Sequence, residues 1–250
     1  MSDAINISML PLSWADIDKV AIEKKALYIT LSYVVSELNV FQRLALMSFE
    51  IFPDQPALEL AARIQSNSLI RVISGKCFEA GQFIKSGSQR AKDPDVRKVC
   101  ANQSKVFEEL SPRKGRDISE RIRNKMAFHL DFRSAVAATR FGGGHIDCNI
   151  YLGGTDGNAF YPIGEQVVFE TALQKAELGA KHAIVSEQDH GDWVEWTMGV
   201  ISLLKKMHAD VFEEFIFPHV RGKLLEEEVL RAPGRLVAKS GVDYLPLFYC

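Results

Sequence analysis

An arginine, an asparagine and a histidine share one short stretch of the chain, RIRNKMAFHLDF at residues 121–132. The imidazole of His129 titrates near neutral pH and therefore suits general acid or base work. Arg123 stays charged and presents a planar fork of N–H donors that matches the oxygens of a phosphate. Asn124 follows the arginine directly and could orient either a phosphate or the histidine. Together these three residue types could bind a phosphate and move a proton beside it.

An ordinary structural role accounts for the same residues. His129 falls at helical spacing on the apolar stripe that Ile118 and Ile122 begin, where a histidine is more often a satisfied core residue than a catalyst. Arg123 could pair with Glu120 three residues earlier, a surface contact that contributes little to stability. The sequence leaves both interpretations open.

The spacing of the arginine and the histidine restricts how they could act. On a straight helix six residues give about 600° of rotation, so Arg123 and His129 would point roughly 120° apart and lie about 9 Å apart along the axis. One copy does not converge on one phosphate, whereas two copies across a two-fold axis could bring both pairs into one cleft. We therefore predict a homodimer.

The stretch RNKMAFH resembles the motif of the HEPN superfamily, helical-bundle proteins of which many are metal-independent ribonucleases. That motif is an arginine and a histidine separated by a few residues, with a polar residue, often asparagine, directly after the arginine. Arg123, Asn124 and His129 match it, and the specific resemblance is confined to this stretch. It implies RNA cleavage through attack of a ribose 2′-hydroxyl on the neighbouring phosphate, without a cofactor. His129 would transfer the proton, Arg123 would clamp the phosphate and Asn124 would orient the reacting groups.

The resemblance also carries expectations about biology. It implies a toxin or antiphage defence effector that is held in check by an antitoxin or another regulatory protein. Two other functions remain open: a non-catalytic helical adaptor that binds a protein partner, and a HEPN-like domain that binds RNA without cutting it. A buried His129 would favour the adaptor, whereas an open basic groove at a two-fold interface would favour the nuclease.

A run of basic residues surrounds the motif, although the whole chain has a net charge of −2. Residues 111–125 contain two acidic residues, Asp117 and Glu120, and a clear excess of cationic ones. Such a local basic face is what an RNA-binding cleft needs, although many charge runs are only solvated connectors. The cationic residues are Arg113, Lys114, Arg116, Arg121, Arg123 and Lys125.

The sequence gives little support for a metal or a disulfide. The segment HIDC places His145 and Cys148 at a ligand-like spacing around Asp147, but no second pair of ligands lies near in the sequence, so we predict no metal. The four cysteines are widely separated and form no CxxC pair, which indicates reduced thiols in a cytoplasmic protein. No apolar run is long enough to span a membrane.

The periodicity of apolar residues predicts that helices position the motif. The chain has 250 residues, of which 47% are apolar and 25% charged, as in an ordinary single globular domain over 1–250. Ser13 and Asp16 form a capping-box signal, and Asp117 is a candidate cap for the helix that carries Arg123. We predict a mainly α antiparallel helical bundle with polar connectors at 86–95 and 111–117. The predicted helical regions are 13–52, 57–85, 96–110, 165–186 and 192–216.

The glycine-rich segment 141–164 interrupts this helical pattern. Its flanks, IDCNIYL and NAFYPI, resemble short strands on either side of the turn sequence GGTDG. We predict a small β-hairpin or ordered loop inserted between helices. The C-terminal tail, residues 218–250, has no assignment from the sequence.

Overall fold

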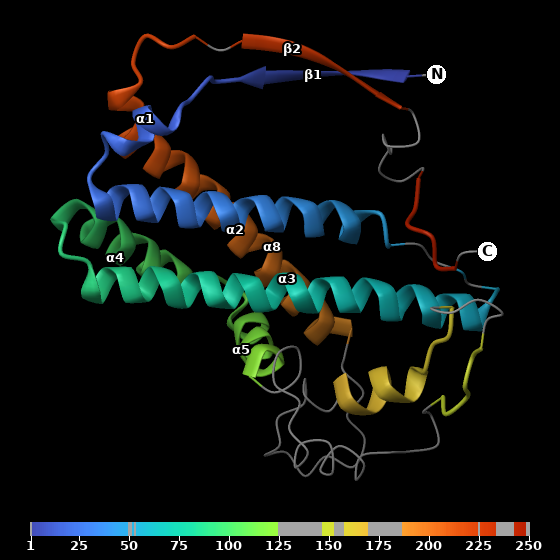
Figure 1. Cartoon of the computed structure of the whole chain (residues 1–250). Helices are drawn as coiled ribbons and strands as arrows, with labels where there is room; N and C mark the ends of the chain where they lie inside the picture. Colours follow the sequence, from blue (N-terminus) through green and yellow to red (C-terminus); the bar gives the residue numbers. More distant parts are fainter. Residues whose placement is uncertain are drawn as a thin grey trace.

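Helices packed side by side form most of the structure. The computed structural model describes residues 2–49, 52, 54–124, 147–152, 158–169, 187–224, 226–233 and 243–248. Among these residues the chain is mainly helical with one small two-stranded antiparallel sheet, which confirms the predicted fold class (Figure 1). The long helices are α2 (Ile22–Leu46), α3 (Pro56–Arg90), α4 (Pro94–Glu109) and α8 (Glu187–Val211). The shorter helix α5 (Arg113–Ile122) packs on α8 and α3.

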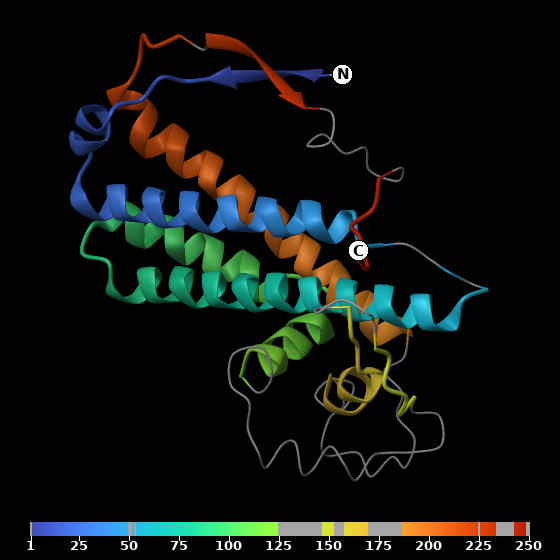
Figure 2. The same cartoon turned by 45° about the vertical axis from the view of Figure 1, so that its right-hand side comes forward.

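The small sheet joins the two ends of the chain. Strand β1 (Ser2–Met9) runs antiparallel to β2 (Glu226–Pro233), with Ser2 opposite Pro233 and Met9 opposite Glu226. Helix α1 (Trp14–Asp18) connects β1 to α2, and the sheet extends along the side of α2 that faces away from α3 (Figures 1 and 2). The tail that had no assignment therefore contributes a strand whose partner lies at the other end of the sequence.

The glycine-rich segment contributes one antiparallel pairing among its described residues. The backbone N–H of Tyr151 donates to the carbonyl of Phe160 at 3.2 Å, and Phe160 returns the bond at 3.0 Å. The two rings stack with centroids 4.5 Å apart. This pairing lies where a hairpin was predicted, while the turn at 153–157 and the residues 141–146 lie outside the described part of the chain.

Aromatic packing fills the centre of the bundle. Trp196 of α8 is 0% exposed and meets the ring of Phe107 of α4 edge-on, with ring centroids 5.7 Å apart. Phe107 in turn lies against Gly81 of α3, where a Cβ atom would be 2.2 Å from the phenyl ring. Glycine is therefore required at this point for α3 and α4 to approach each other.

Two predicted connectors are wrong because helices extend into them. Helix α3 continues to Arg90, since Gly87 lies against Cys100 of α4 and packing supports residues of weak helix propensity. Helix α5 already begins at Arg113, so Asp117 lies inside the helix and does not cap it. Among the described residues, the connectors between α3, α4 and α5 are therefore shorter than predicted. No described helix is both long and apolar enough to cross a membrane.

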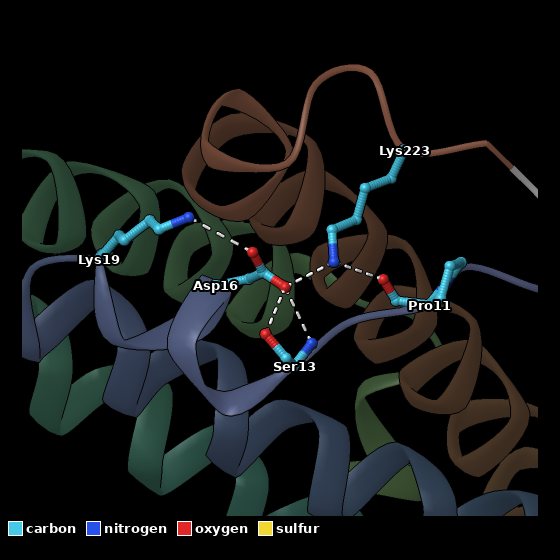
Figure 3. A network of polar contacts seen from close by, with 5 residues as sticks. All are labelled: Pro11, Ser13, Asp16, Lys19 and Lys223. Carbon is cyan, nitrogen blue, oxygen red and sulfur yellow. Dashed lines mark hydrogen bonds and ion pairs between the residues drawn. The ribbon is translucent and has the colours of Figure 1, made fainter.

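A buried carboxylate ties the start of the bundle to its end. Figure 3 shows Asp16 between Ser13 and Lys223, and the Lys223 ammonium also donates to the carbonyl of Pro11 at 2.8 Å. The Lys223 Nζ–Asp16 Oδ2 distance is 2.6 Å, and the Ser13 hydroxyl and N–H reach the same oxygen at 2.7 and 2.9 Å. Asp16 therefore takes the predicted capping-box position and also fixes the segment that leads into β2.

We expect this network to make stability depend on pH at the acidic end. Hydrogen bonds from Lys223 and then from Ser13 hold the pKa of Asp16 well below its usual range. A carboxyl with a lowered pKa in the folded state adds stability above its unfolded pKa and loses it as the pH falls towards the folded pKa. Replacing Lys223 with methionine should raise the pKa of Asp16. The variant should therefore lose less stability than the wild type when the pH falls from 5 to 3.

Urea denaturation at both pH values, with an NMR titration of the Asp16 carboxyl, measures this effect. Lys19→Met is the matched control, because Lys19 is 58% exposed and reaches Asp16 at only 3.4 Å. An unchanged Asp16 pKa in Lys223→Met would contradict the assignment.

Candidate functional site

Arg123 and Asn124 lie side by side where α5 ends. The guanidinium Nη1 of Arg123 donates to the side-chain oxygen of Asn124 at 2.8 Å. The Arg123 side chain is 34% exposed and Asn124 is exposed, so both are available to a ligand from solvent. Two residues of the predicted apolar stripe, Ile118 and Ile122, are fully buried and hold α5 against Trp193 of α8. The remaining motif residue, His129, and the neighbouring Lys125 lie outside the described part of the chain.

A carboxylate from another helix binds the motif arginine. The Nε atom of Arg123 donates to the side chain of Glu79, which lies on α3 and is 47% exposed. The sequence pointed to Glu120 as the partner of Arg123, but the observed partner is 44 positions away. No local spacing could have found Glu79, because the contact exists only once α5 packs on α3. A phosphate that approaches Arg123 must share it with this carboxylate.

Acidic residues from other helices neutralise much of the predicted basic run. Arg116 binds Glu108 of α4 through both of its terminal nitrogens, and this contact lowers the pKa of Glu108. Lys114 forms an ion pair with Asp189 of α8. Arg113 is exposed beside these pairs. Acidic side chains from α4 and α8 therefore offset part of the positive charge that this stretch of the sequence carries.

Arg121 is a partly buried cation of the run. Its Nε atom donates to the carbonyl of Asp117 at 3.1 Å, and its Nη1 atom is buried without a hydrogen-bond partner among the described residues. Burial lowers the pKa of Arg121, although Asp117 and Asp189 oppose that shift. Arg121 is thus a half-buried cation beside α8, whereas the sequence placed it among the RNA-binding residues.

A histidine that the sequence did not single out lies at the same junction of helices. One ring nitrogen of His190, Nε2, lies 3.0 Å from the side-chain oxygen of Asn67 on α3. The ring meets Trp193 edge-on, with centroids 5.6 Å apart. Burial, and then the charge of Arg63, lower the pKa of His190 and keep it neutral at neutral pH. Its neighbour in the chain, Asp189, binds α5 through Lys114, so His190 lies close to the helix that carries Arg123.

Other side chains that could be nucleophiles, a serine and two cysteines, have structural roles. The Ser32 hydroxyl lies 2.9 Å from Nε2 of His208, but it donates its proton to the carbonyl of Tyr28 at 2.8 Å. The imidazole must therefore donate to Ser32, which is the reverse of what an activated serine needs. Burial raises the pKa of the Cys100 thiol to about 11 and raises that of Cys77 further, so both stay protonated.

The described residues do not bring metal ligands together. In the parts of the chain that the structure covers, no three histidine, cysteine or acidic side chains form a group that could hold a metal ion. Asp147 accepts hydrogen bonds from the Tyr151 hydroxyl at 2.9 Å and from the N–H of Asn149 at 2.8 Å. Cys148 is exposed, and His145 lies outside the described residues.

Comparisons with known proteins found nothing similar to this chain. No family model matches the chain, and the searches of curated proteins and of solved structures found no similar protein. The features that can carry a functional argument are the exposed Arg123–Asn124 pair, its Glu79 partner and the neutral His190 nearby.

Proposed function

We propose that the chain is a HEPN-like, metal-independent endoribonuclease. The observation that carries the proposal is the Arg123–Asn124 pair, which is held at an accessible helix end and not in the core. The mainly α bundle and the burial of Ile118 and Ile122 are consistent with the motif lying on a helix that the core anchors. In this proposal the chain is a single HEPN-like domain, works in the cytoplasm and acts as a toxin or antiphage defence effector.

The reaction divides between charge stabilisation and proton transfer. The ribose 2′-hydroxyl attacks the adjacent phosphorus, the bond from phosphorus to the 5′-oxygen breaks, and a cyclic phosphate and a 5′-hydroxyl result. His129 takes the proton from the attacking hydroxyl or supplies one to the leaving oxygen. The fixed charge of Arg123 stabilises the extra negative charge of the phosphorane.

Asn124 connects the arginine to the substrate. Its side-chain oxygen accepts from Arg123, which leaves the two amide hydrogens as donors for a phosphate oxygen. Glu79 holds the other edge of the guanidinium through Nε. Asn124 and Glu79 therefore restrict the orientation of Arg123 before RNA binds, which reduces the entropy lost on binding.

The proposal includes partners that the motif resemblance implies. RNA is the substrate, and its backbone would contact the exposed Arg113, and also Lys114 if a phosphate replaces Asp189 as the partner of that ammonium. Two copies would pair so that Arg123 and His129 of each contribute to one cleft, and an antitoxin or another regulatory protein would hold the activity in check.

Cleavage of total RNA in the presence of EDTA tests the nuclease proposal. We expect the wild-type protein to cut, and we expect Arg123→Ala and His129→Ala to cut at rates lower by on the order of 100-fold, the usual contribution of a positioned acid, base or charge. His219→Ala is the matched control, because His219 is an exposed histidine in the turn η5 (Phe217–His219). Circular dichroism must show that each variant is folded. Equal cleavage by all four proteins, or none by the wild type, would contradict the proposal.

A second candidate function follows from the ion pairs around the basic run. Because Glu79, Glu108 and Asp189 each bind a cation of the run, the surface has less positive potential than RNA binding favours. These ion pairs favour a non-catalytic helical adaptor, which needs neither a free Arg123 nor a positive surface; a domain that binds RNA without cutting it is the remaining alternative. Retention of labelled RNA without cleavage would identify the RNA-binding alternative, and neither retention nor cleavage would favour the adaptor.

A further inference from the structure

A hydrogen-bonded asparagine and histidine join α3 to the start of α8. Asn67 of α3 is 3% exposed, and its side-chain oxygen lies 3.0 Å from Nε2 of His190, which is partly exposed on α8. A carbonyl oxygen can only accept, so Nε2 carries the proton and donates it. In the neutral imidazole the other nitrogen, Nδ1, is therefore an unprotonated acceptor. The Trp193 ring packs edge-on against the imidazole and restricts its rotation.

Two polar atoms of this pair remain for a ligand. Neither Nδ1 of His190 nor the amide nitrogen of Asn67 has a hydrogen-bond partner in the part of the chain that the structure describes. Both atoms keep some accessible surface, because neither is among the described buried side-chain atoms that lack a partner. Unpaired donors are rare in a side chain as buried as Asn67, since an unmade hydrogen bond there is costly. A ligand at this point must offer a donor to Nδ1 and an acceptor to the amide.

The charges around the pair favour an anion. Arg63 is exposed and lies four residues before Asn67 on α3, so the two side chains share one face of the helix. Burial, and then the charge of Arg63, lower the pKa of His190, which shows that this cation acts on the imidazole. Asp189, the neighbour of His190 in the chain, is neutralised by Lys114. The site therefore combines a cation, an amide donor and a neutral acceptor.

We propose that Asn67, His190 and Arg63 form a binding site for inorganic hydrogen phosphate. The O–H of the ligand donates to Nδ1 of His190, one of its oxygens accepts from the amide of Asn67, and its negative charge faces Arg63. Hydrogen phosphate keeps an O–H in both of its ionic forms near neutral pH, so it supplies the donor and the acceptors together. Sulfate has the same shape but no O–H, and it would place an oxygen lone pair against Nδ1.

This phosphate site is separate from the Arg123–Asn124 pair. Glu79, the residue that binds Arg123, lies three turns beyond Asn67 on α3, which is about 18 Å along the helix. A single phosphate cannot contact both places at once. The inference therefore goes beyond the proposed nuclease, and it holds whether or not the protein cuts RNA.

NMR of the imidazole nitrogens tests the site directly. Because Nδ1 of His190 has no proton, a hydrogen bond from phosphate should shift its resonance, which is assigned by its absence from His190→Phe. The wild-type protein is titrated at neutral pH with sodium phosphate and, at matched ionic strength, with sodium sulfate. We expect a saturable shift with phosphate and a Kd for sulfate that is higher by on the order of 10-fold, because sulfate leaves Nδ1 unpaired. No shift with phosphate, or equal affinity for sulfate, would overturn the inference.

A phosphate monoester distinguishes free phosphate from the phosphate group of a nucleotide. Its second pKa is about 6, so near neutral pH most of it has lost the O–H that Nδ1 of His190 requires. Adenosine monophosphate should therefore bind as weakly as sulfate in the same titration. Binding of adenosine monophosphate as tight as that of phosphate would contradict recognition of a protonated oxyanion and overturn the assignment.

Substitutions separate phosphate binding from folding. Arg63→Gln removes a charge from an exposed side chain, so the fold should persist while the Kd for phosphate rises by on the order of 10-fold. Asn67→Asp keeps an oxygen for Nε2 of His190 but loses the donor, and it should abolish the response of Nδ1 to phosphate. The matched control is Arg43→Gln, which changes an exposed arginine on α2 and should bind phosphate as the wild type does. Wild-type affinity in Arg63→Gln, or in Asn67→Asp that circular dichroism shows to be folded, would overturn the inference.

Discussion

Replacing Gly115 with alanine is expected to destabilise the fold by about 3 kcal/mol and to lower Tm by on the order of 10 °C. Gly115 lies where α5 crosses α8, and a Cβ atom there would be 2.2 Å from the backbone oxygen of Asp192 and 2.6 Å from the Cβ atom of Trp196. Neither neighbour is the end of a flexible side chain, so the two helices must move apart. Thermal and urea denaturation measure the loss.

The same substitution bears on the candidate site. Arg123 and Asn124 directly follow α5, so displacement of this helix from α8 and α3 would change the contact between Arg123 and Glu79. Any RNA cleavage should therefore fall together with stability. The control is Gly191→Ala on α8, where a Cβ atom meets nothing within 4 Å and where alanine should stabilise the helix by about 0.5–1 kcal/mol. Wild-type stability in Gly115→Ala would show that α5 does not pack this closely on α8.

Replacing Trp196 with alanine is expected to cost about 3–5 kcal/mol, the usual loss for a large aromatic residue in a core. The indole is 0% exposed, packs edge-on against Phe107, and belongs to the main hydrophobic cluster with Cys77 and Leu204. Its removal leaves a cavity between α3, α4 and α8 that rigid helices fill only in part. Urea denaturation followed by circular dichroism gives the change in the free energy of unfolding.

Phenylalanine at position 196 separates packing from hydrogen bonding. The Nε1 atom of Trp196 is buried and has no hydrogen-bond partner among the described residues, so its N–H adds a desolvation cost in the wild type. Trp196→Phe keeps an aromatic ring next to Phe107 and removes this unsatisfied donor. We expect it to cost less than half as much as Trp196→Ala. Equal losses would mean that the indole nitrogen has a partner or that the cavity dominates both variants.

The sequence by itself determined that the chain is mainly helical and which side of a helix faces the core. Apolar residues at steps of three and four reflect the 3.6-residue turn of an α-helix, a local property that needs no knowledge of neighbours. The stripe of Ile118 and Ile122 was predictable for this reason, and both are buried. Ser13 and Asp16 were equally predictable, because a capping box lies within four consecutive residues.

Only the tertiary structure decided the surroundings of the candidate site. Whether Arg123 is a free cation depends on Glu79, which α3 supplies from a distant part of the sequence. Whether the basic run makes a positive surface depends on Glu108 and Asp189, which come from two other helices. Packing also extended α3 and α5 beyond their predicted limits, because burial against a neighbour outweighs weak local propensity. The pairing of β1 with β2 was unpredictable for a related reason, since antiparallel strands from the two chain ends leave no local turn signal between them.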